Sequence, residues 1–300
     1  MMHRYEEVGP YEPLPSSDLA CERRRADIGI PGVAYREEKA GKMKWERLTI
    51  ESEEGAKSIG RPIGRYDTLT LPRMDTLDEG DADDAAEEVA RELCLLCEEG
   101  RIQPTRILVV GLGNGDLTPD AVGPRTAAKI HATMHIRELD HATFRALECS
   151  EIAVTAPGVM ADSGMEAAET VIGLCDRIAP DVVLAVDALA SRSPSRLGCT
   201  VQISDTGIFP GSGIGNSLSP LNEKTLGVPV IAIGVPTVID SRIFLVEGAG
   251  GLPSEIVAQI EARCRAVRAP MFVSPREING ITESAASVIA RGINQAFGVL

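Results

Sequence analysis

The chain of 300 residues is poor in aromatic side chains and in positive charge. Phe, Trp and Tyr make up 3% of it, and Trp45 is its single tryptophan. Because proteins that bind single-stranded nucleic acid stack the bases on aromatic side chains, this scarcity argues against such a surface. Thirty Lys and Arg stand against 44 Asp and Glu, a net charge of -14, which repels phosphate backbones. The composition predicts no direct nucleic-acid partner and favours basic protein partners.

Long apolar runs and a secretory signal are absent as well. No run of about 18 apolar residues occurs, the length that spans a bilayer. The N-terminal segment MMHRYEEVGPYEPLPSSD has no apolar stretch of signal-peptide length. The seven cysteines are odd in number and scattered, which favours reduced thiols over a disulfide framework. These features predict a soluble cytoplasmic protein without a membrane partner.

The motifs of nucleotide and metal sites are incomplete. In GLGNGD, Asp116 stands where a dinucleotide-binding loop needs its third glycine, and an acid there repels a pyrophosphate. The loop PGSGIGN, residues 210–216, lacks the Lys-Ser/Thr of a phosphate-binding loop. His131 and His135 have the spacing of metal ligands on a helix, but the Glu of H-E-x-x-H and an obvious third ligand are missing. We therefore expect no cofactor and no metal.

Strand-like and helix-like segments alternate along most of the chain. Strands are predicted at 43–52, 181–188 and 200–208, and segments that combine a strand with a turn or loop at 60–71, 105–114, 151–160 and 228–240. Helices are predicted at 75–99, 120–136, 163–180 and from 275 onwards. Such alternation implies parallel βαβ units with right-handed crossovers. The predicted fold class is α/β, a three-layer α/β/α sandwich with a mostly parallel twisted sheet. We expect residues 19–300 to form a single domain behind a polar N-terminal arm, residues 1–18.

Two aspartates that follow buried-looking strands are the strongest functional signal. Asp120 lies in ILVVGLGNGDLTPDAVGP and Asp187 in DVVLAVDALASR. In an open parallel sheet, residues beyond the carboxyl ends of neighbouring strands converge on one crevice, so the two carboxylates can face each other. Such a pair shares one proton, activates a water and protonates a leaving amine. An aspartate after a strand is more often a helix N-cap or turn residue, and this alternative stays open for each.

Longer motifs support a more specific prediction. The segments TPDAVGP, APGVM, AVDALASR, ISDTGIFPGSGIGN and TLGVPVIAIGVPTVID, in this order and spacing, closely resemble the germination protease family of spore-forming Firmicutes, which are atypical aspartic-type endopeptidases. SSDLACE resembles the self-processing site of that family, and MFVSPREINGITESAASVIARGINQAF resembles its C-terminal helix. The resemblance extends over about residues 15–300.

The resemblance implies an endopeptidase that starts the degradation of small acid-soluble spore proteins during germination. It also implies a zymogen that removes its own N-terminal arm between Asp18 and Leu19, a homotetramer in the forespore or spore core, and no metal. The catalytic aspartates of the family's T-P-D-A and I-D-A-L motifs correspond here to Asp120 and Asp187. The family's fold is similar to that of the hydrogenase-maturation endopeptidases, an α/β/α sandwich, in agreement with the alternation of strands and helices.

The chain departs from the family pattern at two places. The stretch between Asp240 and Met271 is shorter than is usual in the family, and Phe209 stands where the family's glycine loop commonly carries His. The loss of that imidazole further weakens a metal-dependent interpretation. Two alternatives remain: a metal-dependent maturation-type endopeptidase on the same fold, and a non-catalytic binder of basic spore proteins.

Two further residues are candidates for substrate binding. If the self-processing site resembles the substrate, an acidic residue precedes the cleaved bond and needs a cation to receive it. Arg192, five residues beyond Asp187, can grip a carboxylate with both arms of its guanidinium, although it can equally pair with a surface acid. Asp205 begins a single D-T-G like that of pepsin-like proteases, a match we interpret as coincidental in an α/β chain. Because Asp205 also ends a predicted strand, it is a candidate for the wall of the same crevice.

Overall fold

The computed structural model describes residues 17–23, 29–211, 218–267 and 271–298. Of the predicted arm only Ser17 and Asp18 are described, and most of the loop 210–216 lies outside the described residues. The strands are β1 (Val33–Ala40), β2 (Met43–Ile50), β3 (Gly64–Thr70), β4 (Arg106–Gly111), β5 (Glu151–Thr155), β6 (Val182–Ser191), β7 (Thr200–Ser204), β8 (Val230–Asp240) and β9 (Phe272–Val273).

Helices alternate with these strands. The α-helices are α1 (Glu53–Ile59), α2 (Glu79–Glu99), α3 (Val122–Ala127), α4 (Met134–Leu139), α5 (His141–Leu147), α6 (Met160–Ser163), α7 (Ala167–Ile178), α8 (Glu223–Leu226), α9 (Ser241–Gly248), α10 (Ser254–Arg265) and α11 (Ile278–Phe297). Short 3-10 helices are η1 (Ala20–Arg23), η2 (Met74–Thr76), η3 (Thr118–Asp120) and η4 (Pro194–Arg196).

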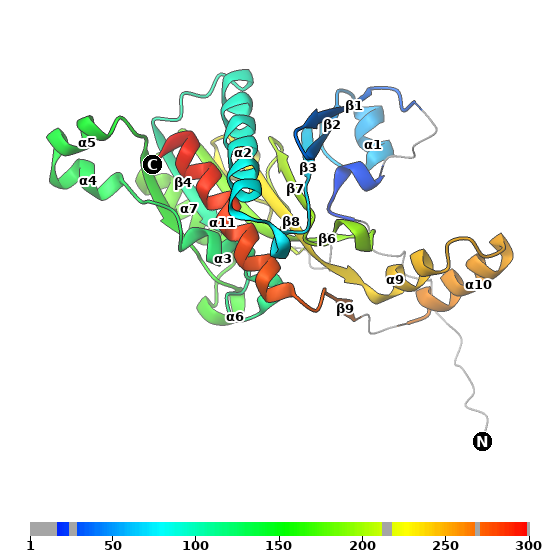
Figure 1. Ribbon diagram of the computed structural model, residues 1–300. Helices are drawn as coiled ribbons and strands as arrows, with labels where there is room; N and C mark the ends of the chain where they lie inside the picture. Colours follow the sequence, from blue (N-terminus) through cyan, green and yellow to red (C-terminus); the bar gives the residue numbers. More distant parts are fainter. Residues whose placement is uncertain (1–16, 24–28, 212–217, 268–270, 299–300) are drawn as a thin grey trace.

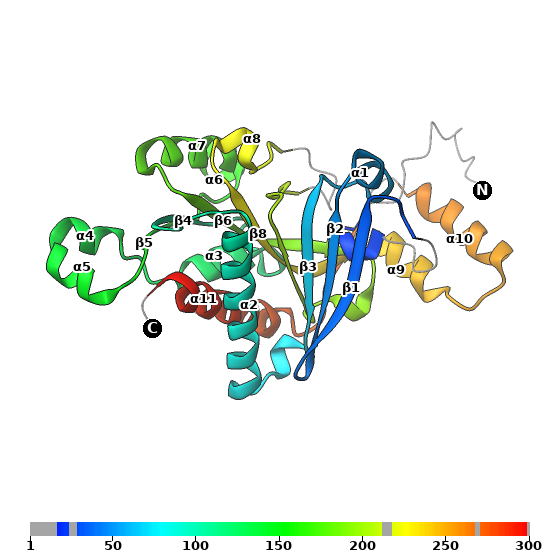
Figure 2. The same cartoon turned by 90° about the horizontal axis from the view of Figure 1, so that it is seen from above.

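One mixed sheet runs through the molecule in the order β1-β2-β3-β7-β8-β6-β4-β5, with β9 paired to β8. The neighbours β8, β6, β4 and β5 run parallel, whereas β1, β2, β3 and β7 pair antiparallel and join β8 through an antiparallel β7–β8 pairing. Helices α2, α3 and α11 lie over one face of the sheet (Figure 1). Figure 2, seen from above, shows α7 and α8 over the other face. These layers confirm the predicted α/β sandwich.

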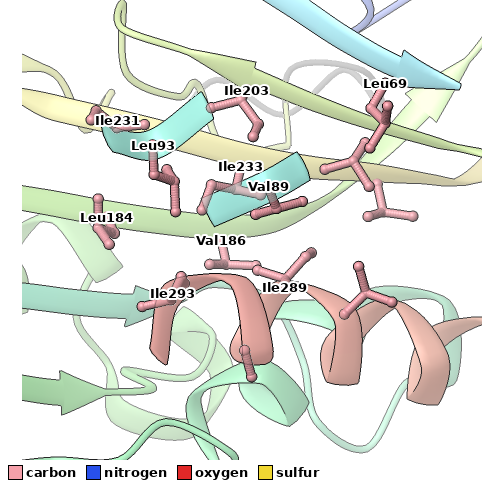
Figure 3. Close-up of a cluster of buried hydrophobic side chains, with 14 of the residues drawn as sticks. Leu69, Val89, Leu93, Leu184, Val186, Ile203, Ile231, Ile233, Ile289 and Ile293 are labelled. Carbon is pink, nitrogen blue, oxygen red and sulfur yellow. The ribbon is translucent and has the colours of Figure 1, made fainter. Parts of the chain in front are cut away.

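Alternation along the strands builds a core on each face of the sheet. Val89 and Leu93 of α2 and Ile289 of α11 pack against Leu184 and Val186 of β6 (Figure 3). The intervening side chains of β4 and β6 point to the opposite face. They are Leu108, Val110, Val183 and Ala185, and they pack with Val171 and Cys175 of α7 and with Leu19 of the N-terminal segment. Because helices cover both faces of the sheet here, the runs 107–110 of β4 and 182–186 of β6 are apolar at every position.

Two predictions about local structure need correction. The helix predicted at 120–136 is two shorter helices, because Thr133 leaves the helix to bond the backbone beside β5: its N–H donates to Ile152 O over 3.0 Å. His131 and His135 therefore do not share one helix, and both are exposed. The sheet also has a larger antiparallel part than the sequence pattern indicated, since β1 to β3 form a meander. None of the helices in the described residues is both long and apolar enough to cross a membrane.

Candidate active site

Close backbone contact between β4 and α3 brings the loop that carries Asp120 next to strand β6. A Cβ on Gly123, in the first turn of α3, would lie 2.2 Å from Leu112 O and 2.5 Å from Val186 O. Leu112 N–H also donates to Val186 O over 2.8 Å. Any side chain at position 123 would push α3 away from both strands, so this approach requires glycine.

Asp120 ends η3, and its own loop holds its carboxylate. Asn114 N–H donates to Asp120 Oδ2 over 2.7 Å. Gly113 has a φ of 108°, and a Cβ there would lie 2.1 Å from the carbonyl oxygen of Asp120. The helix N-cap alternative is wrong for Asp120, because Ala121 occupies the N-cap of α3. The carboxylate is half-buried and has one backbone donor.

The sequence predicted that Asp187 lies beyond the end of its strand, but in the structure it lies inside β6. The pairing of β4 with β6 stops at Gly111 and Val186, one residue earlier. β6 continues to Ser191 because β8 stays paired with it, through a bulge between Leu189 and Ala190. Asp187 is therefore in the middle of β6, level with the point where the neighbouring strand β4 ends. It is 6% exposed, and its Oδ1 accepts the N–H of Ala188 over 2.8 Å.

Asp120 and Asp187 line one cavity of about 360 Å³. Its other described walls are mostly apolar and include Leu112, Leu117, Val159, Met160, Phe209, Leu218 and Phe272. A third carboxylate, that of Asp18, borders the same cavity. The structure thus brings together the two aspartates that the sequence singled out, and it adds the residue at the predicted processing bond.

The surroundings shift both carboxyl groups toward their protonated forms. Burial raises the pKa of Asp187 well above its ordinary value, and the neighbouring charges of Asp120 and Asp18 raise it further. The hydrogen bond from the Ala188 N–H lowers the pKa but does not cancel these effects. Burial also raises the pKa of Asp120, opposed by the hydrogen bond from Asn114. Among the described residues, no Lys or Arg contacts Asp187. Asp187 is therefore the member of the pair that holds a proton most readily.

The N-terminal segment Ser17–Arg23 is docked beside this pair. Asp18 N–H donates to Ala190 O, and Ala190 N–H donates to Asp18 Oδ2, each over 2.9 Å. Arg61, just before β3, contacts Asp18 Oδ1 at 3.1 Å. Leu19 is fully buried in the core beneath α7 and α8. Asp18 is thus held between β6 and Arg61, and Leu19, on the other side of the predicted processing bond, is anchored in the core.

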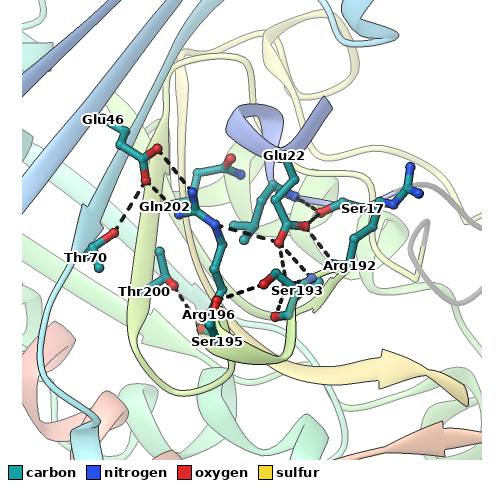
Figure 4. Close-up of polar contacts among 12 residues, drawn as sticks. Ser17, Glu22, Glu46, Thr70, Arg192, Ser193, Ser195, Arg196, Thr200 and Gln202 are labelled. Carbon is teal, nitrogen blue, oxygen red and sulfur yellow. Dashed lines mark hydrogen bonds and ion pairs between the residues drawn. The ribbon is translucent and has the colours of Figure 1, made fainter. Parts of the chain in front are cut away.

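Glu22 anchors the same segment on its C-terminal side (Figure 4). Its Oε1 accepts the hydroxyl of Ser191 over 2.8 Å and the N–H of Ser193 over 3.0 Å. Its Oε2 accepts the N–H of Arg192 over 2.7 Å and also the hydroxyl of Ser17. Four donors on one carboxylate hold the chain after Leu19 against the end of β6.

The structure gives the two predicted substrate-binding residues different surroundings. Arg192 is exposed, and its backbone N–H serves Glu22. Asp205 Oδ1 accepts the N–H of Arg65 over 2.7 Å at the start of β3, and Asp205 is not among the residues that border the cavity. The cation that contacts Asp18 is Arg61, which the sequence gave no reason to select because it precedes Asp187 by more than a hundred residues. Substrate binding by Arg192 and Asp205 stays a prediction.

Metal-ligating side chains are dispersed in the part of the chain that the structure describes. No three His, Cys, Asp or Glu side chains there are grouped so that they could hold a metal ion. All seven cysteines are free thiols, as the odd count indicated.

Comparison with known proteins gives a consistent family match. The germination protease family matches residues 16–247. The chain is 38% identical to a germination protease of Caldanaerobacter subterraneus over 93% of each chain. It is 36% identical to one of Clostridium perfringens over 93% of this chain and 94% of the relative. A germination protease of Oceanobacillus iheyensis is 42% identical over 72% of this chain and 58% of its own length.

Among solved structures, a NiFe-hydrogenase maturation protease from Thermococcus kodakarensis is similar in part. The match covers 56% of this chain and 99% of that protein, with 21% identity and a TM-score of 0.31.

Proposed function

The chain belongs to the germination protease family, and we propose that it hydrolyses peptide bonds with the carboxyl pair of Asp120 and Asp187. The observation that carries this proposal is the shared cavity, in which a buried acid lies close enough to a second carboxylate for that charge to raise its pKa further. A strongly shifted carboxyl group in a cleft is typical of an acid-base catalyst.

The two environments assign different roles to the pair. Asp187 is the more buried member and carries the proton, whereas Asp120 has a backbone donor that favours its ionised form. Asp120 takes a proton from a water whose oxygen bonds to the peptide carbonyl carbon, while Asp187 gives its proton to the carbonyl oxygen. The proton on Asp120 then passes to the amide nitrogen as the C–N bond breaks, and Asp187 recovers a proton from the hydroxyl that becomes the new carboxyl group.

We further propose that the chain is made as a zymogen that cleaves itself between Asp18 and Leu19. Asp18 borders the cavity and pairs with Ala190 of β6, so the uncleaved segment occupies the place of a substrate. Mild acidity would favour this step because it supplies the proton that Asp187 holds, and drying would favour it because loss of water disfavours the charged carboxylate. Release of residues 1–18 would remove Asp18 from the wall of the cavity and, with it, one of the charges that raise the pKa of Asp187.

Arg61 supports a preference for an acidic residue before the cleaved bond. Its guanidinium contacts the Asp18 carboxylate, the position that such a residue would take in a substrate. Arg192 remains the second candidate for this role. By family resemblance we propose that the substrates are small acid-soluble spore proteins, that the enzyme is a homotetramer, and that it acts in the forespore or spore core.

Incubation of the purified chain with a small acid-soluble spore protein, with and without EDTA, tests this proposal. We expect cleavage after acidic residues at equal rates in both samples. Loss of cleavage in EDTA that added metal restores would favour the metal-dependent alternative. Binding without any cleavage would favour the non-catalytic alternative.

A further inference from the structure

Gln202 of β7 holds the main chain on both sides of Leu19. Its Nε2 donates to the carbonyl oxygen of Asp18 over 3.3 Å, and its Oε1 accepts the N–H of Ala20 over 2.8 Å. Because a backbone N–H can only donate, the Oε1 must face Ala20, and the amide orientation of Gln202 follows from this contact. The donor end of Gln202 therefore points at the carbonyl of the Asp18–Leu19 bond.

The sheet places Gln202 in the same row as Asp187. Both residues pair in register with Gly234 of the intervening strand β8. Residues paired across neighbouring strands point to the same face, and strands are about 4.8 Å apart, so the two side chains stand on either side of Gly234, roughly 10 Å apart at Cα. Gly234 has no side chain, and the side chain of Leu189 lies over it, since a Cβ on Gly234 would be 2.4 Å from Leu189 Cδ1. Gly234 and Leu189 border a small cavity together with Asp18 and Gln202.

The surroundings of Gln202 make this contact more than a surface hydrogen bond. Gln202 is 8% exposed, and the Leu19 that it spans is fully buried. The neighbours of Gln202 along β7, Val201 and Ile203, point to the opposite face, into the core beneath α2 and α11. Both the oxygen and the nitrogen of the Gln202 side-chain amide thus bind the docked main chain.

We infer that Gln202 is a catalytic residue for cleavage of the bond between Asp18 and Leu19, where it donates to the carbonyl oxygen and stabilises the negative charge that this oxygen gains before the proton of Asp187 reaches it. The inference rests on the proposed self-processing. When water adds to the Asp18 carbonyl carbon, its oxygen becomes a stronger hydrogen-bond acceptor, and a donor fixed in advance stabilises that state more than the starting amide. The bond to Ala20 N–H keeps the donor in place through the reaction. The same clamp would hold the main chain of a protein substrate that enters after the arm has left.

Two substitutions of Gln202 in the full-length chain separate this role from a structural one. Gln202→Leu removes the donor and the acceptor. Gln202→Glu keeps the size and the acceptor for Ala20, but it donates to the carbonyl only when protonated. Thr200→Val, two residues earlier on β7 and on the same face, is the matched control, because its hydroxyl bonds Arg196 O rather than the docked segment. Intact-mass spectrometry follows the loss of residues 1–18, and thermal unfolding checks that each variant is folded.

We expect Gln202→Leu to slow processing by about 10²-fold to 10³-fold, the usual effect of deleting one such donor, and Thr200→Val to process at close to the wild-type rate. The rate of Gln202→Glu relative to wild type should rise as the pH falls, since the protonated side chain regains a donor. A relative rate for Gln202→Glu that does not change with pH, or rapid processing by a folded Gln202→Leu, would overturn the inference. If Gln202→Leu does not fold, the pH dependence of Gln202→Glu decides.

The wild-type chain and Asp187→Asn distinguish this inference from the function on which it rests. If wild type processes itself, Asp187→Asn does not, and the Gln202 variants process at the wild-type rate, then the role of Gln202 is wrong while the proposed function stands. Absence of cleavage at the Asp18–Leu19 bond in the wild-type chain would overturn the self-processing and the role of Gln202 together.

Discussion

Two regions of the molecule bury carboxyl groups, and they treat the charge in opposite ways. Between α2 and the antiparallel strands, Asp67 and Glu92 are buried beside the guanidinium groups of Arg47 and Arg65. In the cavity at the parallel strands, Asp187 is equally buried, but its nearest charges are those of other carboxylates.

The difference separates a structural use of buried acids from a chemical one. Burial and Asp67 raise the pKa of Glu92 to about 7 even though Arg47 lowers it, and ion pairs with Arg47 and Arg65 keep the cluster closed within the fold. In the described part of the chain no cation offsets the burial of Asp187, and Asp187 lines a cavity. A buried acid without a cation, at a cavity, is the combination expected of a catalytic group. The following predictions test this contrast.

The largest effect should come from removing the acid of the cavity pair. We expect Asp187→Asn and Asp120→Asn each to lower proteolysis by about 10²-fold to 10⁴-fold, because each variant lacks one of the two proton-transfer groups. Glu92→Gln removes a carboxylate that is as buried but lies outside the cavity, and we expect near-normal activity. Rates on one protein substrate, with circular dichroism as a check of folding, compare the three. Equal losses in all of them would remove the distinction between the regions.

A smaller effect should follow from the loss of the cation at Asp18. Arg61→Ala should lower kcat/KM by about 10-fold to 100-fold for a substrate with Glu before the cleaved bond, the usual worth of a hydrogen bond to a charged group. A matched peptide with Gln at that position should lose far less. Arg192→Ala is the parallel variant, and the peptide pair shows which arginine receives the acid. If neither variant discriminates between the two peptides, acid recognition by these arginines is wrong.

A modest effect is expected at Glu22. Glu22→Gln keeps the size of the side chain but removes the charge that strengthens its bonds to Ser191, Ser193 and the Arg192 N–H. We expect self-processing to slow by about 5-fold to 10-fold, the size of about 1 kcal/mol of lost docking energy. Cleavage of an added substrate by the already processed enzyme serves as the readout for the catalytic pair, which this variant leaves intact.

The two regions should also respond oppositely in stability. Since the pKa of Asp187 is raised in the folded state, folding is penalised as the pH rises above its unfolded pKa of about 3.9, and the penalty is absent below that value. Asp187→Asn should therefore raise the Tm by a few degrees at about pH 7 and leave it unchanged near pH 3 to 4. Arg47→Ala should instead lower the Tm, because it leaves buried carboxylates without a partner. Thermal unfolding at two pH values measures both; a lower Tm for Asp187→Asn at neutral pH would contradict the account.

The sequence predicted where the two aspartates of the parallel region lie better than it predicted the contacts that the antiparallel region makes with the N-terminal segment. Runs of β-branched residues identify β4 and β6, and the glycine-rich turn after β4 leads directly to Asp120. The sequence placed Asp187 just past the end of its strand, whereas β6 continues through Asp187 to Ser191. This extension depends on the pairing of β6 with β8, which continues after β4 has ended. Arg61 and Gln202 contact a segment far from them in the sequence, so no local spacing could identify them. The break after α3 was missed because contacts with β5 override the helical pattern.

The N-terminal sequence of the full-length chain after incubation at mildly acidic pH tests the central claim most directly. The account predicts that the wild-type protein acquires Leu19 as its first residue, whereas Asp187→Asn, treated in parallel, keeps its original N-terminus. Cleavage of Asp187→Asn at the same bond and rate, or an active wild-type protein with an uncleaved N-terminal segment, would contradict it.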